Sequence, residues 1–131
     1  MLYQDAVATI VAALPDVAAI YLFGSRARGD SHGVSDVDIA VLGSGPLDAL
    51  ERFDLQQKLA GILHAPVDLV DLRSASTVLR VQVLRDAALL HDGAPNERAH
   101  FEATALGAYA RLNEERREIL EDVKKGGRVY G

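Results

Sequence analysis

Two acidic residues in one apolar segment are the best candidates for chemistry in this sequence. Asp36 and Asp38 stand two positions apart in residues 34–42, which read VSDVDIAVL and predict a strand. Side chains at i and i+2 of a strand point to the same face, so the two carboxylates would be presented together. Aspartate is depleted in strands, which favours a binding role over the alternative, an edge strand whose acids are merely solvated. Such a pair fits Mg²⁺, which prefers oxygen ligands and is usually held by one or two carboxylates together with substrate phosphates.

A Gly-Ser turn shortly before the acidic segment offers a place for phosphate. Gly24 and Ser25 follow the apolar run 18–23 and precede a predicted short helix over residues 25–29. The first N–H groups of a helix are unpaired and its dipole is positive there, which favours anions. Gly24 would let a phosphate approach without a Cβ in the way, and Ser25 would bind it through its hydroxyl and backbone N–H. The alternative is an ordinary turn between a strand and a helix.

Other polar residues near the turn are candidates for binding phosphate groups or for orienting the acids. Arg26 and Arg28 follow Ser25 closely, and either guanidinium could neutralise the charge of bound phosphate groups. Both could equally be ordinary surface arginines. Ser35 precedes the acidic pair and could orient Asp36, or it could simply begin the strand.

A third carboxylate commonly completes a two-metal site for phosphoryl transfer. The predicted strand 67–72 offers Asp68 and Asp71. They are three positions apart, so they lie on opposite faces of a strand and only one can face the site. Asp71 stands at the exit of the strand, where acids commonly make hydrogen bonds within turns and caps.

Together these motifs carry a family resemblance. The Gly-Ser turn and the Asp-x-Asp pair resemble the nucleotidyltransferase superfamily related to DNA polymerase beta, and the short chain looks like its minimal members, the MNT domains. The stretch 67–79 is similar to the MntA antitoxins, which are paired with HEPN-domain toxins. The resemblance implies that Asp36, Asp38 and Asp68 are the catalytic carboxylates, that they bind two Mg²⁺ ions, and that ATP is the substrate. It also implies that the acceptor is a tyrosine hydroxyl of the toxin, a ribonuclease that AMP addition silences.

Two other functions remain open from the sequence. One is an enzyme acting on small molecules, such as an aminoglycoside nucleotidyltransferase, although those relatives usually carry an additional helical domain. The other is a non-catalytic antitoxin that acts by binding alone. The presence of all three carboxylates and of the Gly-Ser turn favours catalysis.

The order of predicted elements is typical of an α/β (α+β) nucleotidyltransferase fold, with a small mixed β-sheet backed by helices and a long C-terminal helix. We expect residues 1–131 to form a single nucleotidyltransferase (MNT) domain. A helix is expected to open at residues 43–46, with Ser44 as a possible N-cap. The long helix has one apolar stripe, formed by Phe101, Ala105, Ala108, Leu112, Ile119 and Val123. The other predicted elements are helices 3–14 and 75–86 and strands 17–23 and 87–91.

The composition limits the range of partners and compartments. The net charge is −5, there is no Trp and only 5% of residues are aromatic, whereas nucleic-acid binders present a basic face or stacking aromatics. We therefore expect no direct nucleic-acid binding. The absence of cysteine excludes disulfides and thiolate metal sites. No apolar run approaches the ~18 residues of a membrane span, and no basic stretch precedes an apolar core as in a signal peptide, so a cytoplasmic protein is expected.

Overall fold

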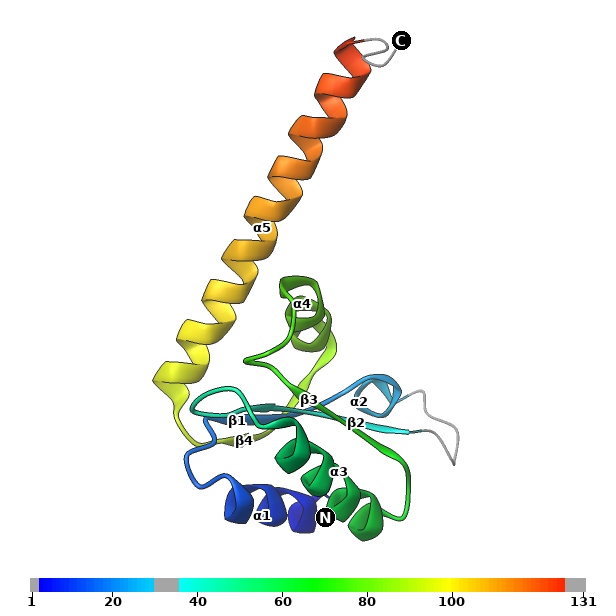
Figure 1. The fold of residues 1–131 in the computed structure, drawn as a ribbon, viewed down its shortest axis with the longest axis vertical. Coiled ribbons are helices and arrows are strands. Elements are labelled where there is room, and N and C mark those ends of the chain that lie inside the picture. The colour runs from blue at the N-terminus through cyan, green and yellow to red at the C-terminus, as the bar shows by residue number, and fades with distance from the viewer. Residues whose placement is uncertain (1–2, 30–35, 127–131) are drawn as a thin grey trace.

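The computed structural model describes residues 3–29 and 36–126. The helices are α1 (Gln4–Ala13), α2 (Ser25–Arg28), α3 (Ala49–Leu63), α4 (Thr77–Asp86) and α5 (Pro95–Gly126). A β-sheet lies between them, with α1 and α3 on one face and with α4 and the first part of α5 on the other (Figure 1). Among the described helices, none is both long and apolar enough to cross a membrane. The predicted α/β fold with a long C-terminal helix is confirmed.

The sheet is mixed, as predicted, and has the strand order β3-β2-β1-β4. Its strands are β1 (Ala19–Phe23), β2 (Val37–Leu42), β3 (Val67–Asp71) and β4 (Ala88–Asp92). Strand β1 pairs antiparallel with β2 and with β4, whereas β2 and β3 are parallel. Parallel neighbours need a crossover connection, which is usually helical; here α3 supplies it.

Alternating residues of the strands supply two separate apolar cores. Ile20 and Ile39 point to one face and are buried against Ile10 of α1 and Leu59 of α3. On the other face Tyr21, Ala40 and Leu42 are buried with Val83 of α4 and Phe101 of α5. The guanidinium groups of Arg73 and Arg80 lie 5.5 and 4.9 Å from the centre of the Phe101 ring. These cation–π contacts help to fix α5 to the rest of the protein.

The predicted start of α3 was wrong. The helix does not begin in the segment 43–46 with Ser44 as its N-cap; it begins after Asp48. The Asp48 carboxylate accepts hydrogen bonds from the backbone N–H groups of Leu50 (3.1 Å) and Glu51 (3.3 Å). An acceptor must stand immediately before the first turn to reach these unpaired donors, so the closer carboxylate determines where the helix starts.

Candidate active site

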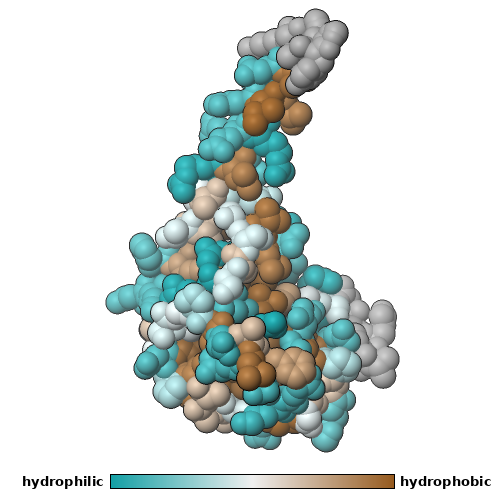
Figure 2. All heavy atoms as spheres, viewed as in Figure 1, coloured by the Kyte–Doolittle hydropathy of each residue, from teal (hydrophilic) through white to brown (hydrophobic). Residues whose placement is uncertain are grey.

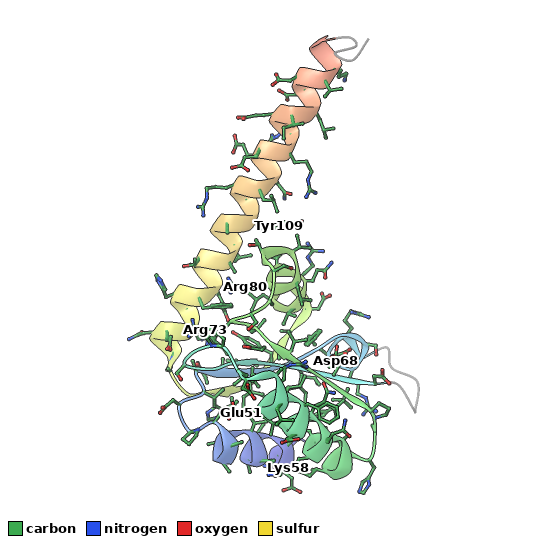
Figure 3. All side chains as sticks on the ribbon, viewed as in Figure 1. Glu51, Lys58, Asp68, Arg73, Arg80 and Tyr109 are labelled. Carbon is green, nitrogen blue, oxygen red and sulfur yellow. The ribbon has the colours of Figure 1, made fainter. Side chains whose placement is uncertain are left out.

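Asp38 and Asp68 lie directly beside each other in the sheet. The parallel pairing of β2 with β3 sets Asp38 opposite Asp68, and residues that are opposite in a ladder project to the same face of a sheet. Asp38 is also opposite Phe23, the last residue of β1. Both acids therefore lie at the end of the sheet that is next to α2, where Figure 3 shows Asp68.

The two acids share the sheet face that α4 and α5 cover in part. Ala40 and Val70 lie two positions beyond Asp38 and Asp68 and also form a pair in the ladder. Both residues pack in the core that contains Phe101. Because side chains two apart point to the same face, the acids continue this face beyond the cover of the helices. Asp68 is exposed and Asp38 is half-buried, which leaves the pair open to a ligand.

Asp36 lies just before β2 rather than within it. The pairing of β2 with β3 begins at Val37 and Val67, and the Val37 N–H donates to the carbonyl of Pro66. Pro66 has no N–H of its own to extend the ladder, which explains why the strand starts after Asp36. Asp36 is exposed, and the prediction that it shares a strand with Asp38 was therefore wrong by one residue.

Gly24 packs against the carboxylate of Asp38. Its backbone has φ +76° and ψ −157°, a conformation that is essentially restricted to glycine. A Cβ added at this position would collide with Oδ2 of Asp38 and lie 3.1 Å from its Cγ. The Gly-Ser turn and the acid are thus brought together, and the turn accommodates the carboxylate only because residue 24 has no side chain.

The electrostatic environment of Asp38 is that of a crowded carboxylate. Burial raises its pKa above the ordinary value of 3.8, and the negative charges of Asp68 and Asp36 raise it further. The positive charge of Arg28 acts in the opposite direction. Burial and nearby like charges both disfavour the ionised form of a carboxyl group. Asp36 and Asp68 are therefore close enough to Asp38 for their charges to repel it. A bound cation would relieve this repulsion.

The other predicted nucleotide-binding residues occupy or border α2. Ser25 and Arg26 begin this short helix and are half-buried. Arg28 ends it, is exposed, and lies 3.7 Å from the carboxylate of Asp86 on α4. This ion pair was missed in the sequence, since nothing in their spacing indicates that α2 and the end of α4 are neighbours. Ser35 lies outside the described residues.

Asp71 is buried and its oxygens are engaged within the protein. One oxygen accepts hydrogen bonds from the backbone N–H of Leu47 (2.9 Å) and the hydroxyl of Ser74 (2.7 Å), and the other accepts from the Arg73 N–H (3.1 Å). These are the turn hydrogen bonds expected at the exit of β3. Asp71 points to the opposite face from Asp68, and it joins the loop before α3 to the turn after β3.

The carboxylates suit a divalent cation in ligand type and charge, although their side chains do not converge on one point. Within residues 3–29 and 36–126, no three His, Asp or Glu side chains are grouped tightly enough to hold a metal ion. Mutual repulsion opposes such convergence. Hard oxygen ligands from two strands, on an open face beside a Gly-Ser turn, nevertheless fit Mg²⁺ with substrate phosphates as further ligands.

A nucleotidyltransferase family model, described as polymerase beta nucleotidyltransferase, matches residues 6–95 of this chain. The chain belongs to this family. The match includes all four strands and every candidate site residue.

Relatives within the polymerase beta nucleotidyltransferase family are similar over most of the chain. The protein adenylyltransferase MntA of Shewanella oneidensis is 46% identical over 110 residues, which cover 84% of this chain and 78% of that protein. A crystal structure of a toxin–antitoxin with AMP-PNP contains a chain that superimposes with a TM-score of 0.80 at 42% identity, covering 90% of this chain and 94% of that one. A structure of a tri-AMPylated Shewanella oneidensis HEPN toxin with its MNT antitoxin gives a TM-score of 0.77 at 38% identity, over 94% and 96% of the two chains.

Proposed function

We propose that this protein is an antitoxin that neutralises a cognate HEPN-domain ribonuclease toxin by transferring AMP from ATP to a tyrosine hydroxyl of the toxin. The observation that carries the proposal is the pairing of Asp38 with Asp68 beside Gly24. The 46% identity to a protein adenylyltransferase and the likeness to antitoxins in toxin complexes support it.

Each candidate residue has a role in this proposal. Asp36, Asp38 and Asp68 would hold two Mg²⁺ ions, and the bound metal would neutralise phosphate charge and stabilise the charge that develops at the α-phosphorus. We leave Asp71 out of this set, a choice that its three internal hydrogen bonds support. The nucleotide phosphates are bound by the residues of the turn and α2 and by the residue before the acids, namely Gly24, Ser25, Arg26, Arg28 and Ser35.

The reaction is an in-line displacement at the α-phosphorus of ATP. The tyrosine oxygen forms a bond to that phosphorus, the bond to the bridging oxygen of the β-phosphate breaks, and pyrophosphate leaves. The tyrosine proton has to be removed, because its pKa in water is about 10. A site carboxylate accepts the proton and holds the hydroxyl in line with the leaving group.

Intact-mass spectrometry of the toxin tests this proposal. After incubation with this protein, ATP and Mg²⁺, we expect AMP-sized mass increments on the toxin, and tryptic fragments should place them on tyrosine. Omission of Mg²⁺ or ATP should remove the increments. A stable complex without increments would favour an antitoxin that acts by binding, whereas transfer to aminoglycosides alone would favour a small-molecule transferase.

The glycine of the turn gives a second test with an internal control. Gly24→Ala should lower AMP transfer about 100-fold, since displacing a reacting group by ~1 Å can cost this much and a Cβ there collides with Asp38. Gly29→Ala is the matched control, because Gly29 also has a positive φ (+78°) but no atom lies within 4 Å of an added Cβ. Both variants should lose stability, but only the first should lose transfer per folded molecule; equal rates would contradict the role of Gly24.

The setting of this activity is also part of the proposal. We infer that residues 1–131 work as one nucleotidyltransferase domain, which is supported by the two cores that share a single sheet. The target of a ribonuclease antitoxin is in the cytoplasm, and we place the protein there.

A further inference from the structure

The second half of α5 extends away from the rest of the protein. The helix has 32 residues, or about 48 Å at 1.5 Å per residue. Phe101 and Ala105 in its first half are buried, but Ile119 and Val123 in its second half are 63% and 46% exposed. Figure 1 shows this half standing clear of the sheet and of α4.

The exposed apolar residues continue the stripe that fixes α5 to the protein. Residues 101, 105, 112, 119 and 123 follow one another at steps of four and seven, which keeps them on one side of a helix with 3.6 residues per turn. Leu120 lies next to this line and is 62% exposed. Figure 2 shows apolar side chains rising along the helix from the body. We call Leu112, Ile119, Leu120 and Val123 the α5 stripe.

A stripe of this kind is typical of a surface that is covered by a partner. Most of the stability of a protein helix comes from packing of its apolar face, and contiguous exposed apolar surface marks interaction sites. In α5 the apolar face continues past the buried residues Phe101 and Ala105 to Ile119, Leu120 and Val123, which no other described part of the chain (residues 3–29 and 36–126) buries.

Relatives from toxin–antitoxin structures indicate the kind of partner. The nucleotidyltransferase family model ends at residue 95, where α5 begins, so the helix is an addition to the catalytic fold. In contrast, the two toxin-bound relatives match 90% and 94% of the chain. Since α5 makes up 32 of 131 residues, each match has to include more than half of it. The helix therefore accompanies the catalytic fold in proteins that bind a toxin.

The stripe is also on the correct side for the chemistry. Phe101, which begins the line, packs on the sheet face that carries Ala40, and this is the face of Asp38 and Asp68. At the root of the free half, a groove of about 650 Å³ lies between α4, α5 and the sheet, and its lining includes Leu106 and Tyr109. A partner seated on the stripe and in this groove would lie on the same side of the sheet as the acids.

We propose that the α5 stripe is the docking surface for the protein whose hydroxyl receives AMP, and that it binds an apolar helical face of that toxin. The inference rests on the proposed function for the identity of the partner. Charged residues of both signs lie along the stripe: Glu115 and Asp122 border it on one side and Lys124 on the other, and Arg116 lies within it, which suits a partner surface with an apolar centre and a polar rim. Docking on α5 brings the acceptor hydroxyl to the protein, and the acids of the sheet catalyse its reaction with ATP.

The test introduces two charges into the stripe and the same change of charge on the opposite side of the helix. Ile119→Glu with Val123→Glu should weaken binding of the cognate HEPN toxin at least about 30-fold by isothermal titration calorimetry without ATP, the loss typical of central interface residues. The control combines Ala110→Glu with Arg117→Gln, two exposed residues on the far side. It should bind toxin as tightly as the unmodified protein. All these residues are on α5, which contains no candidate site residue, so stabilisation by ATP and Mg²⁺ should be equal in all three proteins.

The outcomes separate this inference from the proposed function. Unchanged toxin affinity in the Ile119/Val123 variant would overturn the docking surface. So would a dimer in sedimentation velocity that this variant dissociates while toxin binding persists, because the stripe would then join two copies of this chain. Toxin binding that depends on the stripe, without any transfer of AMP by the unmodified protein, would retain the docking surface and reject the proposed function.

Discussion

Asp38→Asn is expected to abolish AMP transfer while making the protein more resistant to unfolding. The loss of transfer should be about 1,000-fold or more, because electrostatic stabilisation by a bound metal contributes several kcal/mol and each 1.36 kcal/mol changes a rate tenfold. Asparagine has the shape of aspartate but lacks the charge that binds a cation. Asp16→Asn is a suitable control, since Asp16 is exposed and lies before β1, at the end opposite to Gly24.

The gain in stability follows from the direction of the pKa shift of Asp38. Its pKa is raised in the folded protein by burial and by Asp68 and Asp36, so the folded state binds the proton more tightly than the unfolded chain does. The resulting stability is fully present below the pKa of the unfolded carboxyl and is lost as the pH rises through the raised pKa. At neutral pH the ionised carboxylate therefore destabilises the fold, and the neutral amide removes this penalty.

Thermal unfolding in metal-free buffer checks this prediction. At pH 7 the midpoint of Asp38→Asn should exceed that of the unmodified protein, and the difference should shrink as the pH falls towards the ordinary carboxyl pKa of 3.8. Addition of Mg²⁺ and ATP should stabilise the unmodified protein by mass action, with little effect on the variant. A variant that is less stable at every pH would show that Asp38 has a structural role.

Asp71→Asn and Asp68→Asn should have opposite consequences, which separates the two acids of β3. Asp71 is 7% exposed and accepts three hydrogen bonds. An amide in its place loses the charge and directs N–H groups at donors, and we expect a loss of about 2–3 kcal/mol in the free energy of unfolding. Asp68 is exposed and its charge repels Asp38, so its replacement should not lower stability but should remove transfer.

Urea unfolding together with the mass-spectrometric assay measures both effects. Transfer should be corrected for the folded fraction, so that Asp71→Asn retains activity per folded molecule. The opposite pattern, in which Asp71→Asn is stable and inactive while Asp68→Asn transfers AMP normally, would assign the third carboxylate to Asp71.

Much of the fold and of the candidate site could be predicted because local patterns and global structure agree. Apolar segments predicted the strands, and apolar residues spaced three, four and seven apart predicted α5. The separation of Asp68 from Asp71 by three residues placed them on opposite faces, as the structure has them. The Gly-Ser turn and the acidic pair together are the motifs of one family, and in the structure Gly24 packs against Asp38.

The remainder depends on contacts that sequence patterns do not contain. The start of α3 depends on whether Ser44 or Asp48 reaches the first turn, and both are good capping residues. The first residue of β2 depends on its partner β3, where Pro66 limits the pairing. The ion pair of Arg28 with Asp86 depends on how α2 and α4 meet, which no local rule describes.

The parallel pairing of β2 with β3 also determines when the site exists during synthesis. Asp38 and Asp68 become neighbours only after α3 has formed, reversed the chain direction and delivered β3 to the sheet. A nascent chain that ends before Asp68 already has its turn and its first two acids, but it has no assembled site. We therefore expect AMP transfer only from chains that extend past Asp68, and we expect a chain truncated or unfolded within α3 to be inert towards ATP.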